Sequence, residues 1–244
     1  STLFPSTTLF RSAVGLRAAG YTGFRLPTLN ELYRPFVVFP ITTQANAALT
    51  TEKLRGAEIG IDLTPVPGIT LSSTAFINRL DDAIANVTIA TNVRMRQNVD
   101  HITAMGIEVT AAARTGNIGV SASYAYSHSR VHAPEMAFDG FTPAQSPRHA
   151  ASATLGWTSN HGPFLSATLR YVGRQYEDDL QRDTLPAALT LDAVARLPLG
   201  RGVTLVARGE NLFDEAVVNR KAGSSIDLGT TQTLWLGVCF ASAG

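Results

Sequence analysis

The sequence has 244 residues, 16% of them charged, and its formal net charge is +1 at pH 7. A chain that binds nucleic acid usually gathers a basic excess on one face, so this balance disfavours nucleic acid as a partner. The single cysteine, Cys239, excludes an internal disulfide and a structural zinc site built from thiolates. No apolar run approaches the roughly 18 residues of a membrane-spanning helix, so the chain either does not cross a bilayer or crosses it as strands.

The N-terminal residues need separate treatment. Residues 2–12, TLFPSTTLFRS, resemble the translation of a sequencing-library adapter, with Ser6 where a tyrosine would stand. A natural strand rich in threonine and phenylalanine is the alternative interpretation. The N-terminus also lacks the basic and apolar regions of a secretory signal. We therefore expect residues 1–12 to be an artefact, with the natural sequence starting mid-gene near Ala13.

From Ala13 onward, apolar and polar residues alternate with a period of two, which predicts β-strands. In the segment 57–63, for example, Ile59 and Ile61 fall on one face, while Glu58 and Asp62 fall on the other. The expected strands number about ten and suit the length of a tilted membrane strand. They span 13–23, 57–63, 69–78, 107–114, 118–127, 151–157, 165–171, 189–197, 203–207 and 234–240.

The connections between these strands alternate in length. Short turns are expected at Pro65 to Gly68, at Gly116-Asn117, at 160–163 and at Leu199 to Gly202. Long connections are expected at about 25–53, 79–103, 129–147, 175–187 and 214–229. Barrels of the outer-membrane type have short turns on the periplasmic side and long loops outside, so the strict alternation favours a membrane barrel over a soluble sandwich.

Charged residues recur on one face of the expected strands. A soluble sandwich would place such a face in water, and a wide barrel would place it in a wet lumen while the apolar face meets lipid. The residues expected to share this face are Glu58, Asp62, Glu108, Arg114, Arg170, Asp192, Arg196, Arg208 and Glu210.

Segments at the two ends of the chain carry a family resemblance. The segment 23–36, GFRLPTLNELYRPF, resembles the sequence that TonB-dependent outer-membrane receptors carry where a mid-barrel strand emerges outside. Its threonine is also a plausible helix cap. ARGENLFDE at 207–215 is similar to the penultimate strand of that family, and TLWLGVCF at 233–240 to its last strand. The motif residues, expected to be structural, are Phe24, Arg25, Pro27, Thr28, Asn30, Glu31, Tyr33, Asn211, Leu212, Phe213, Asp214 and Phe240.

The resemblance implies an all-β fold, in which residues 13–240 form the C-terminal portion, about ten strands, of a 22-stranded antiparallel transmembrane barrel. The plug domain would lie upstream, and residues 241–244 would form a short tail. It implies a place in the lipid bilayer of the bacterial outer membrane and uptake of a siderophore, another metal chelate, a cobalamin or a glycan. The implied partners are the TonB complex and the barrel-assembly machinery, which reads the terminal aromatic. No cofactor is implied.

Candidate ligand-binding residues lie where the long connections begin. His128 and His132 share one face of a strand, so contact with a metal or a metal chelate is one interpretation. Spacing fixes no third ligand, which leaves an ordinary polar pair as the alternative, and His101 and His149 add nothing to the pair. Arg34 and Tyr176, in other long connections, complete the candidate set.

Catalysis finds no support in the sequence, because no GxSxG, HExxH or P-loop pattern is present. The pairs Asp81-Asp82 and Asp178-Asp179 are interpreted as solvated charges at the entry to loops. Two alternatives remain: a complete ten-strand outer-membrane enzyme of the omptin type, and a soluble β-sandwich that binds a ligand or partner. A ten-strand arc would leave two unpaired edges, which predicts aggregation if the chain is expressed alone.

Overall fold

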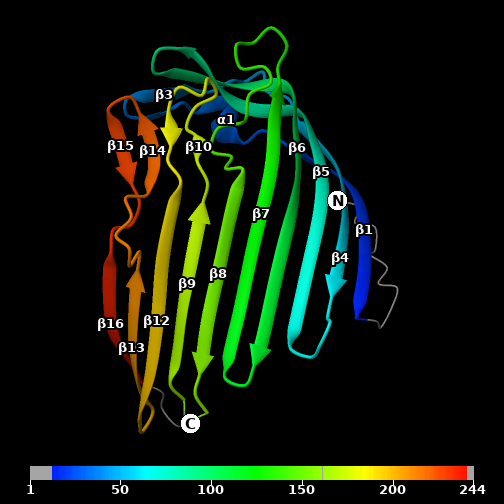
Figure 1. Ribbon diagram of the computed structural model, residues 1–244. Coiled ribbons are helices and arrows are strands. Elements are labelled where there is room, and N and C mark those ends of the chain that lie inside the picture. Colours follow the sequence, from blue (N-terminus) through cyan, green and yellow to red (C-terminus); the bar gives the residue numbers. More distant parts are fainter. Residues whose placement is uncertain (1–12, 161, 241–244) are drawn as a thin grey trace.

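One antiparallel sheet organises the computed structural model, which describes residues 13–160 and 162–240 (Figure 1). Its ten long strands form one hydrogen-bonded path, as predicted. The path consists of β1 (Val14–Arg25), β4 (Glu52–Leu63), β5 (Ile69–Ala90), β6 (Val93–Thr115), β7 (Ile118–His132), β8 (His149–Thr158), β9 (Phe164–Val172), β12 (Ala188–Gly200), β13 (Val203–Glu210) and β16 (Thr233–Phe240). The proposed artefact 1–12 and the tail 241–244 lie outside the described residues.

The strands are joined by tight turns at one end of the sheet, here called the turn end. Thr115 and Ile118 flank a two-residue turn, and all four turns lie where the sequence predicts them. Gly68 shows why one turn requires glycine. Its φ is +87°, and a Cβ at this position would lie 2.6 Å from the carbonyl oxygen of Arg114.

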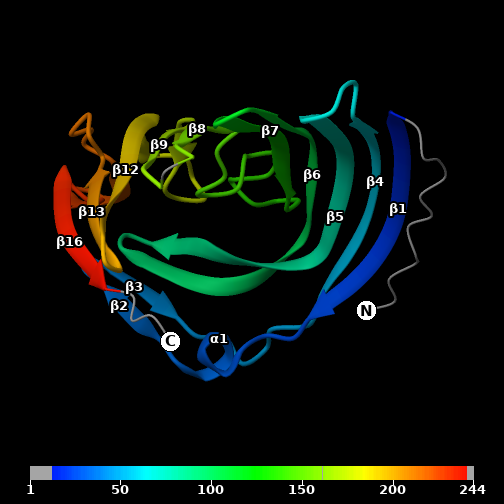
Figure 2. The same cartoon turned by 90° about the horizontal axis from the view of Figure 1, so that it is seen from below.

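Small elements gather at the opposite end, called the loop end. They are the helix α1 (Leu29–Tyr33) and the strands β2 (Phe36–Val38), β3 (Ile41–Gln44), β10 (Gln175–Tyr176), β11 (Thr184–Leu185), β14 (Val218–Ala222) and β15 (Ser225–Leu228). Figure 2 shows α1, β2 and β3 lying across the open side of the arc, between β1 and β16. Both Nη atoms of Arg220 lie 3.3 Å from the carbonyl oxygen of Phe39, which links β14 to the β2–β3 turn.

The predicted helical turn at Thr28 is confirmed. The Thr28 hydroxyl accepts the backbone N–H of Glu31 at 3.3 Å, and the Glu31 carboxylate accepts the backbone N–H of Thr28 at 2.7 Å, which makes a capping box. Burial alone would raise the pKa of Glu31. Hydrogen bonds from Arg25 and Thr28 outweigh that effect and lower the pKa to about 2.

The segment 79–103 is not the long connection that the sequence predicts. The β5–β6 hairpin continues through it and turns at Thr91 and Asn92. The alternation of apolar and polar residues is interrupted here, because Asp82 adopts a φ of +54° and breaks the regular strand. Beyond this point small apolar residues face the loops, and the buried cluster comprises Ala83, Val87, Val99, Val131, Ala133 and Phe138. The extended hairpin crosses the concave side of the arc (Figure 2).

The two faces of the sheet differ in chemistry as predicted. On the concave face, Arg17 donates to Asp62 Oδ2 at 3.1 Å and to the Ser72 hydroxyl at 3.1 Å. The register carries this face from strand to strand and places all nine predicted charged residues on it. The convex face instead exposes large apolar side chains, including Leu16, Ile59, Ile77, Ile107, Leu155 and Leu236. No helix in the described ranges has the length and apolarity needed to span a membrane.

Adjacent alanines on β6 test the assignment of the faces. Ala111 pairs with Leu71 and points to the convex face, whereas Ala112 pairs with Thr70 and points to the concave face. Lysine on the lipid face of a barrel costs on the order of 2 kcal/mol inside the hydrocarbon layer. Ala111→Lys should therefore lower the free energy of unfolding of the full-length protein in phospholipid vesicles by about that amount, as measured by denaturant titration. Ala112→Lys is the matched control, and equal losses in both variants would contradict the assignment.

The capping box generates a pH-dependent prediction. Because the pKa of Glu31 is lowered on folding, its stabilising contribution is complete above its ordinary pKa of 4.5 and is lost as the pH falls through about 2. Hydrogen exchange of the Leu32 and Arg34 amides, corrected for the intrinsic rate, should show weaker protection at low pH. Glu31→Gln should abolish this pH dependence while α1 persists. A dependence that survives in the variant would refute the role of Glu31.

Candidate functional site

A cavity of about 420 Å³ at the loop end is the candidate ligand site, here called the arginine cavity. Three arginines and two tyrosines line it, and none of its lining residues in the described chain is a carboxylate. The polar and aromatic part of the lining consists of Arg130, Arg148, His149, Tyr171, Arg174 and Tyr176. Guanidinium groups suit the bidentate recognition of carboxylates and phosphates, and aromatic faces suit planar groups. The lining can therefore bind an anionic, partly aromatic ligand.

Contacts with neighbouring elements hold these side chains in place. The Arg174 guanidinium lies 6.0 Å from the ring centroid of Tyr176. The carbonyl oxygen of Tyr176 accepts the backbone N–H of Gln145 at 2.7 Å, which ties β10 to the loop after β7. The Tyr124 hydroxyl lies 2.8 Å from Nδ1 of His149, at the start of β8. The cavity thus draws on three segments distant in sequence.

A second cavity of about 290 Å³ adjoins the loops on the concave side and contains a buried acid, Glu177. Burial raises the pKa of this carboxyl, although Gln145 Nε2 donates to it at 3.1 Å. The interpretation of Asp178-Asp179 as solvated charges is wrong. Asp178 is buried and accepts the backbone N–H groups of Leu180, Arg182 and Asp183, and Asp179 accepts the backbone N–H of Thr88 at 2.8 Å. Both carboxylates therefore stabilise the loop between β10 and β11 by accepting hydrogen bonds from backbone N–H groups.

The four predicted ligand residues do not come together. Tyr176 lines the arginine cavity. Arg34 is exposed and ends α1, where its backbone N–H donates to the Asn30 carbonyl at 3.1 Å. His128 and His132 share the convex face of β7, as their spacing predicts. His128 accepts a hydrogen bond from Arg130 at 3.2 Å, whereas His132 lies opposite His101 on β6.

Sequence reasoning missed Arg148, Arg174 and His149 as members of the site. Each flanks the end of a predicted strand beside a long connection. That position could have identified them as candidates, because binding residues are concentrated in loops. Their convergence depends on the fold of the loops 133–148 and 173–187, which strand periodicity does not specify.

The motif at 23–36 has a structural role at the loop end. The Arg25 guanidinium bonds to Glu31 at 2.9 Å and to the buried carboxylate of Glu52. The other oxygen of Glu52 accepts the backbone N–H of Ile84 at 2.7 Å. One arginine and one carboxylate therefore connect β1, α1, β4 and the extended part of β5.

The second motif closes the loop between β13 and β16. Asn211 is buried with a φ of +47°, and its amide donates to the carbonyl oxygens of Glu215 at 2.9 Å and Thr230 at 3.0 Å. Asp214 accepts the backbone N–H of Gln232 at 3.1 Å. Phe240 lies at the turn end, paired with Val203.

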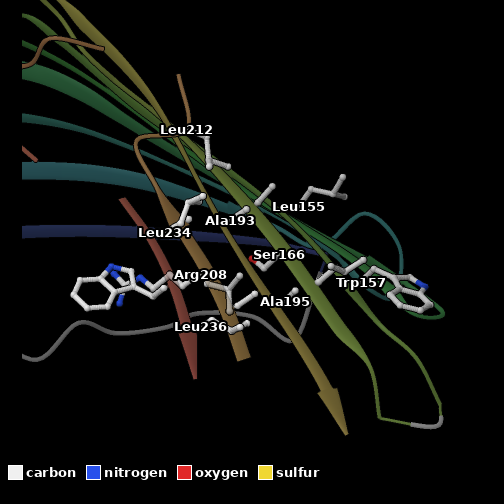
Figure 3. Close-up of a pocket in the computed structure, with 15 residues that line it drawn as sticks. Leu155, Trp157, Ser166, Ala193, Ala195, Arg208, Leu212, Leu234 and Leu236 are labelled. Atoms are coloured by element: carbon white, nitrogen blue, oxygen red, sulfur yellow. The ribbon is translucent and has the colours of Figure 1, made fainter. Parts of the chain in front are cut away.

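A larger hollow of about 680 Å³ crosses β8, β9, β12, β13 and β16 (Figure 3). Alanines at 193, 195 and 207 form its floor, and larger side chains such as Trp157 and Leu236 border it. These residues alternate on the convex face, and the hollow is almost entirely apolar. It belongs to the apolar outside of the sheet rather than to a site for a polar ligand.

Comparison with known proteins agrees with this architecture. A family model described as TonB dependent receptor-like, beta-barrel matches residues 5–212. The iron-regulated outer membrane virulence protein of Vibrio cholerae is 28% identical over 239 residues, which cover 90% of this chain and 36% of the relative. A vitamin B12 transporter of Vibrio vulnificus is 28% identical over 198 residues, covering 80% of this chain and 29% of the relative.

Among solved structures, the ferric yersiniabactin uptake receptor of Yersinia pestis superposes with a TM-score of 0.75 at 16% identity, covering 96% of this chain and 36% of that structure. The chain spans about a third of the length of these proteins. These matches favour the receptor fold over the omptin-type barrel and the soluble sandwich. The chain belongs to the TonB-dependent receptor-like β-barrel family and is an outer-membrane protein.

Proposed function

We propose that residues 13–240 form the C-terminal part of the barrel of an outer-membrane active transporter that takes up a scarce ligand with energy supplied through TonB. Residues 1–12 are then adapter-derived and residues 241–244 a tail. Membership of the receptor family supports this proposal, as do relatives named as a vitamin B12 transporter and as an iron-regulated outer membrane virulence protein. In this proposal the chain catalyses no reaction, and the barrel-assembly machinery inserts it by means of the strand that ends at Phe240.

The arginine cavity carries the proposal about the ligand. Its three guanidinium groups, and a lining with no carboxylate among the described residues, favour an anionic metal chelate, such as a ferric siderophore, over a neutral glycan. Tyrosine rings provide flat surfaces for the aromatic or conjugated groups of such a chelate. Cobalamin is the second candidate, because a vitamin B12 transporter is among the relatives.

Substitution in the cavity tests this ligand class. A hydrogen bond to a charged group contributes about 1.5–3 kcal/mol, so Arg148→Ala or Arg174→Ala should weaken ligand binding about tenfold or more. The full gene would be deleted, and growth of the strain measured on ferric siderophores, other metal chelates, cobalamin and glycans. The apparent affinity of each variant would then be measured by uptake of the labelled ligand that the deletion strain fails to use.

Arg201→Ala, in the turn between β12 and β13 at the opposite end of the sheet, is the matched control and should behave as wild type. Uptake should vanish in a strain that lacks TonB. Uptake that persists without TonB would reject active transport. Wild-type affinity in both cavity variants would instead reject the arginine cavity as the ligand site.

A further inference from the structure

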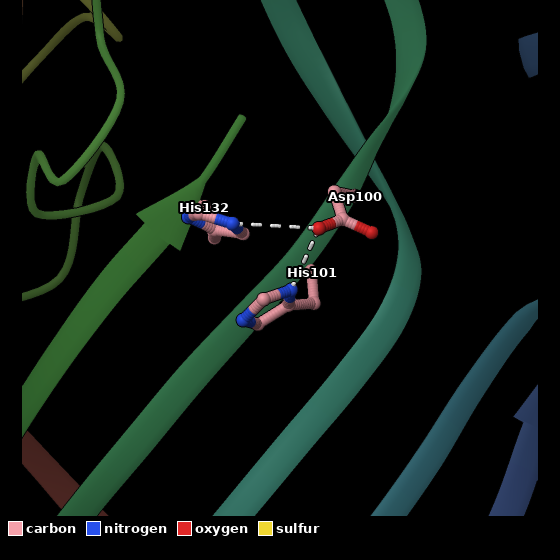
Figure 4. A group of neighbouring side chains, drawn as sticks. All are labelled: Asp100, His101 and His132. Atoms are coloured by element: carbon pink, nitrogen blue, oxygen red, sulfur yellow. Dashed lines mark hydrogen bonds and ion pairs between the residues drawn. The ribbon is translucent and has the colours of Figure 1, made fainter. Parts of the chain in front are cut away.

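Two histidines face each other across β6 and β7 at the loop end, outside the arginine cavity. His101 and His132 are directly opposed in the antiparallel register, and their ring centroids are 4.6 Å apart. Directly opposed residues have Cβ atoms about 4.5–5.5 Å apart, so the two imidazoles can converge on one point. Figure 4 shows both rings beside the carboxylate of Asp100.

The three side chains have the spacing of a coordination site. Oδ2 of Asp100 lies 3.1 Å from Nδ1 of His101 and 3.6 Å from Nε2 of His132. One ligating atom from each of the three residues lies within 4.8 Å of the others. In a tetrahedral zinc site with bonds of 2.0–2.1 Å, neighbouring ligand atoms are separated by about 3.3 Å. The two carboxylate–imidazole distances bracket that value.

A second carboxylate orients one of the imidazoles. Nδ1 of His132, the nitrogen directed away from Asp100, lies 3.3 Å from Oδ1 of Asp139. Asp139 is itself held by the backbone N–H of Ala133, which donates to the same oxygen at 2.8 Å. A carboxylate that accepts the second N–H of a histidine fixes its tautomer and leaves the other nitrogen free to bind a metal.

The site is exposed at the loop end of the convex face. The side chains of Asp100 and His132 are 55% and 48% exposed. On the same convex face, Arg55 pairs with Asp81 at 3.4 Å, and such a charged pair belongs above the hydrocarbon layer. Two imidazoles and a carboxylate leave the fourth position of a tetrahedral ion to water.

One cation competes for the site. Nη2 of Arg79 lies 3.1 Å from Nδ1 of His101, so this nitrogen accepts a hydrogen bond where an ion would bind. Arg79 is half exposed and also bonds to Asp81 at 2.6 Å, which offers it an alternative partner. A metal ion would take the place of the guanidinium at His101.

We propose that Asp100, His101 and His132 bind one divalent transition-metal ion of the Zn²⁺, Ni²⁺ or Cu²⁺ class on the convex rim, with Asp139 as the residue that positions His132. Imidazole and carboxylate ligands suit these ions. The site is separate from the arginine cavity, and its existence does not depend on the proposed transport function.

Zinc titration of the purified full-length protein tests the proposal. The protein would carry no histidine tag, be stripped with a chelator and be titrated with Zn²⁺ in a calorimeter. His101→Ala and His132→Ala should each weaken binding of one ion at least tenfold. Asp139→Asn should weaken it about tenfold, as the loss of an outer-shell partner does. Arg79→Gln should strengthen binding, because the competing cation is removed.

His128→Ala is the matched control, since it lies on the same face of β7 and should leave the titration unchanged. Each variant would be compared with wild type for its level in the outer membrane and for ligand uptake. X-ray absorption of the zinc-loaded wild type should show two imidazole ligands. A first shell of oxygen alone, or wild-type zinc affinity in His101→Ala and His132→Ala, would overturn the site while leaving the transport proposal untouched.

Discussion

A bilayer offers no hydrogen-bond partner to the backbone, and this constraint governs the whole chain. Each N–H and C=O group within the hydrocarbon must be paired by the protein itself, so the crossing segments must be helices or laterally paired strands. Here the pairing runs without a break from β1 to β16. Because a strand exposes alternate side chains on opposite faces, the same ladder separates an apolar convex face from a polar concave face. Arg17, Asp62 and Ser72 meet on the concave side, where charge is tolerated.

Above the hydrocarbon layer the constraint relaxes, and side chains rather than backbone ladders organise the structure. Glu52 is buried and satisfied by Arg25 and by the backbone of Ile84. Asp178 folds a loop around its carboxylate in a comparable way. Burying a carboxylate costs free energy unless it is hydrogen-bonded or paired with a cation. These carboxylates explain how long loops form a defined surface that includes the arginine cavity.

The loop end carries two sites of different chemistry. The arginine cavity combines cations with aromatic rings and suits a bulky anion. The histidine pair lies on the convex face of β6 and β7, where two imidazoles and a carboxylate suit a small cation. Arg130, which lines the cavity, and His132 share the convex face of β7 because they are two positions apart. The two sites therefore differ in the loops and neighbouring strands that complete them, not in the face of the sheet.

Strand periodicity predicts most of the sheet, since the four turns at the turn end and the face of the nine charged residues follow from local alternation. The capping turn at Thr28 is equally local. Periodicity fails at 79–103. The backbone of Asp82 is in the left-handed region and interrupts the alternation, so the extended strands are predicted as a loop. Periodicity also leaves His101 and His132 unpaired, because both lie beyond the ends of the predicted strands 107–114 and 118–127. The predicted turn at Gly116-Asn117 does set the register that places them opposite each other. The arginine cavity depends on loop conformation, which spacing alone does not determine.

The central claim is that the sheet has an apolar, lipid-facing convex side and a polar concave side. The most direct test is a spin-label scan along β6 from 103 to 114 in the full-length protein, reconstituted in vesicles. Each residue would be replaced by cysteine in turn, on a Cys239→Ser background. Collisions of the label with oxygen, which partitions into lipid, should peak at odd positions such as Ile107 and Val109. They should fall at even positions such as Glu108 and Thr110. Oxygen accessibility with no period of two would contradict the account.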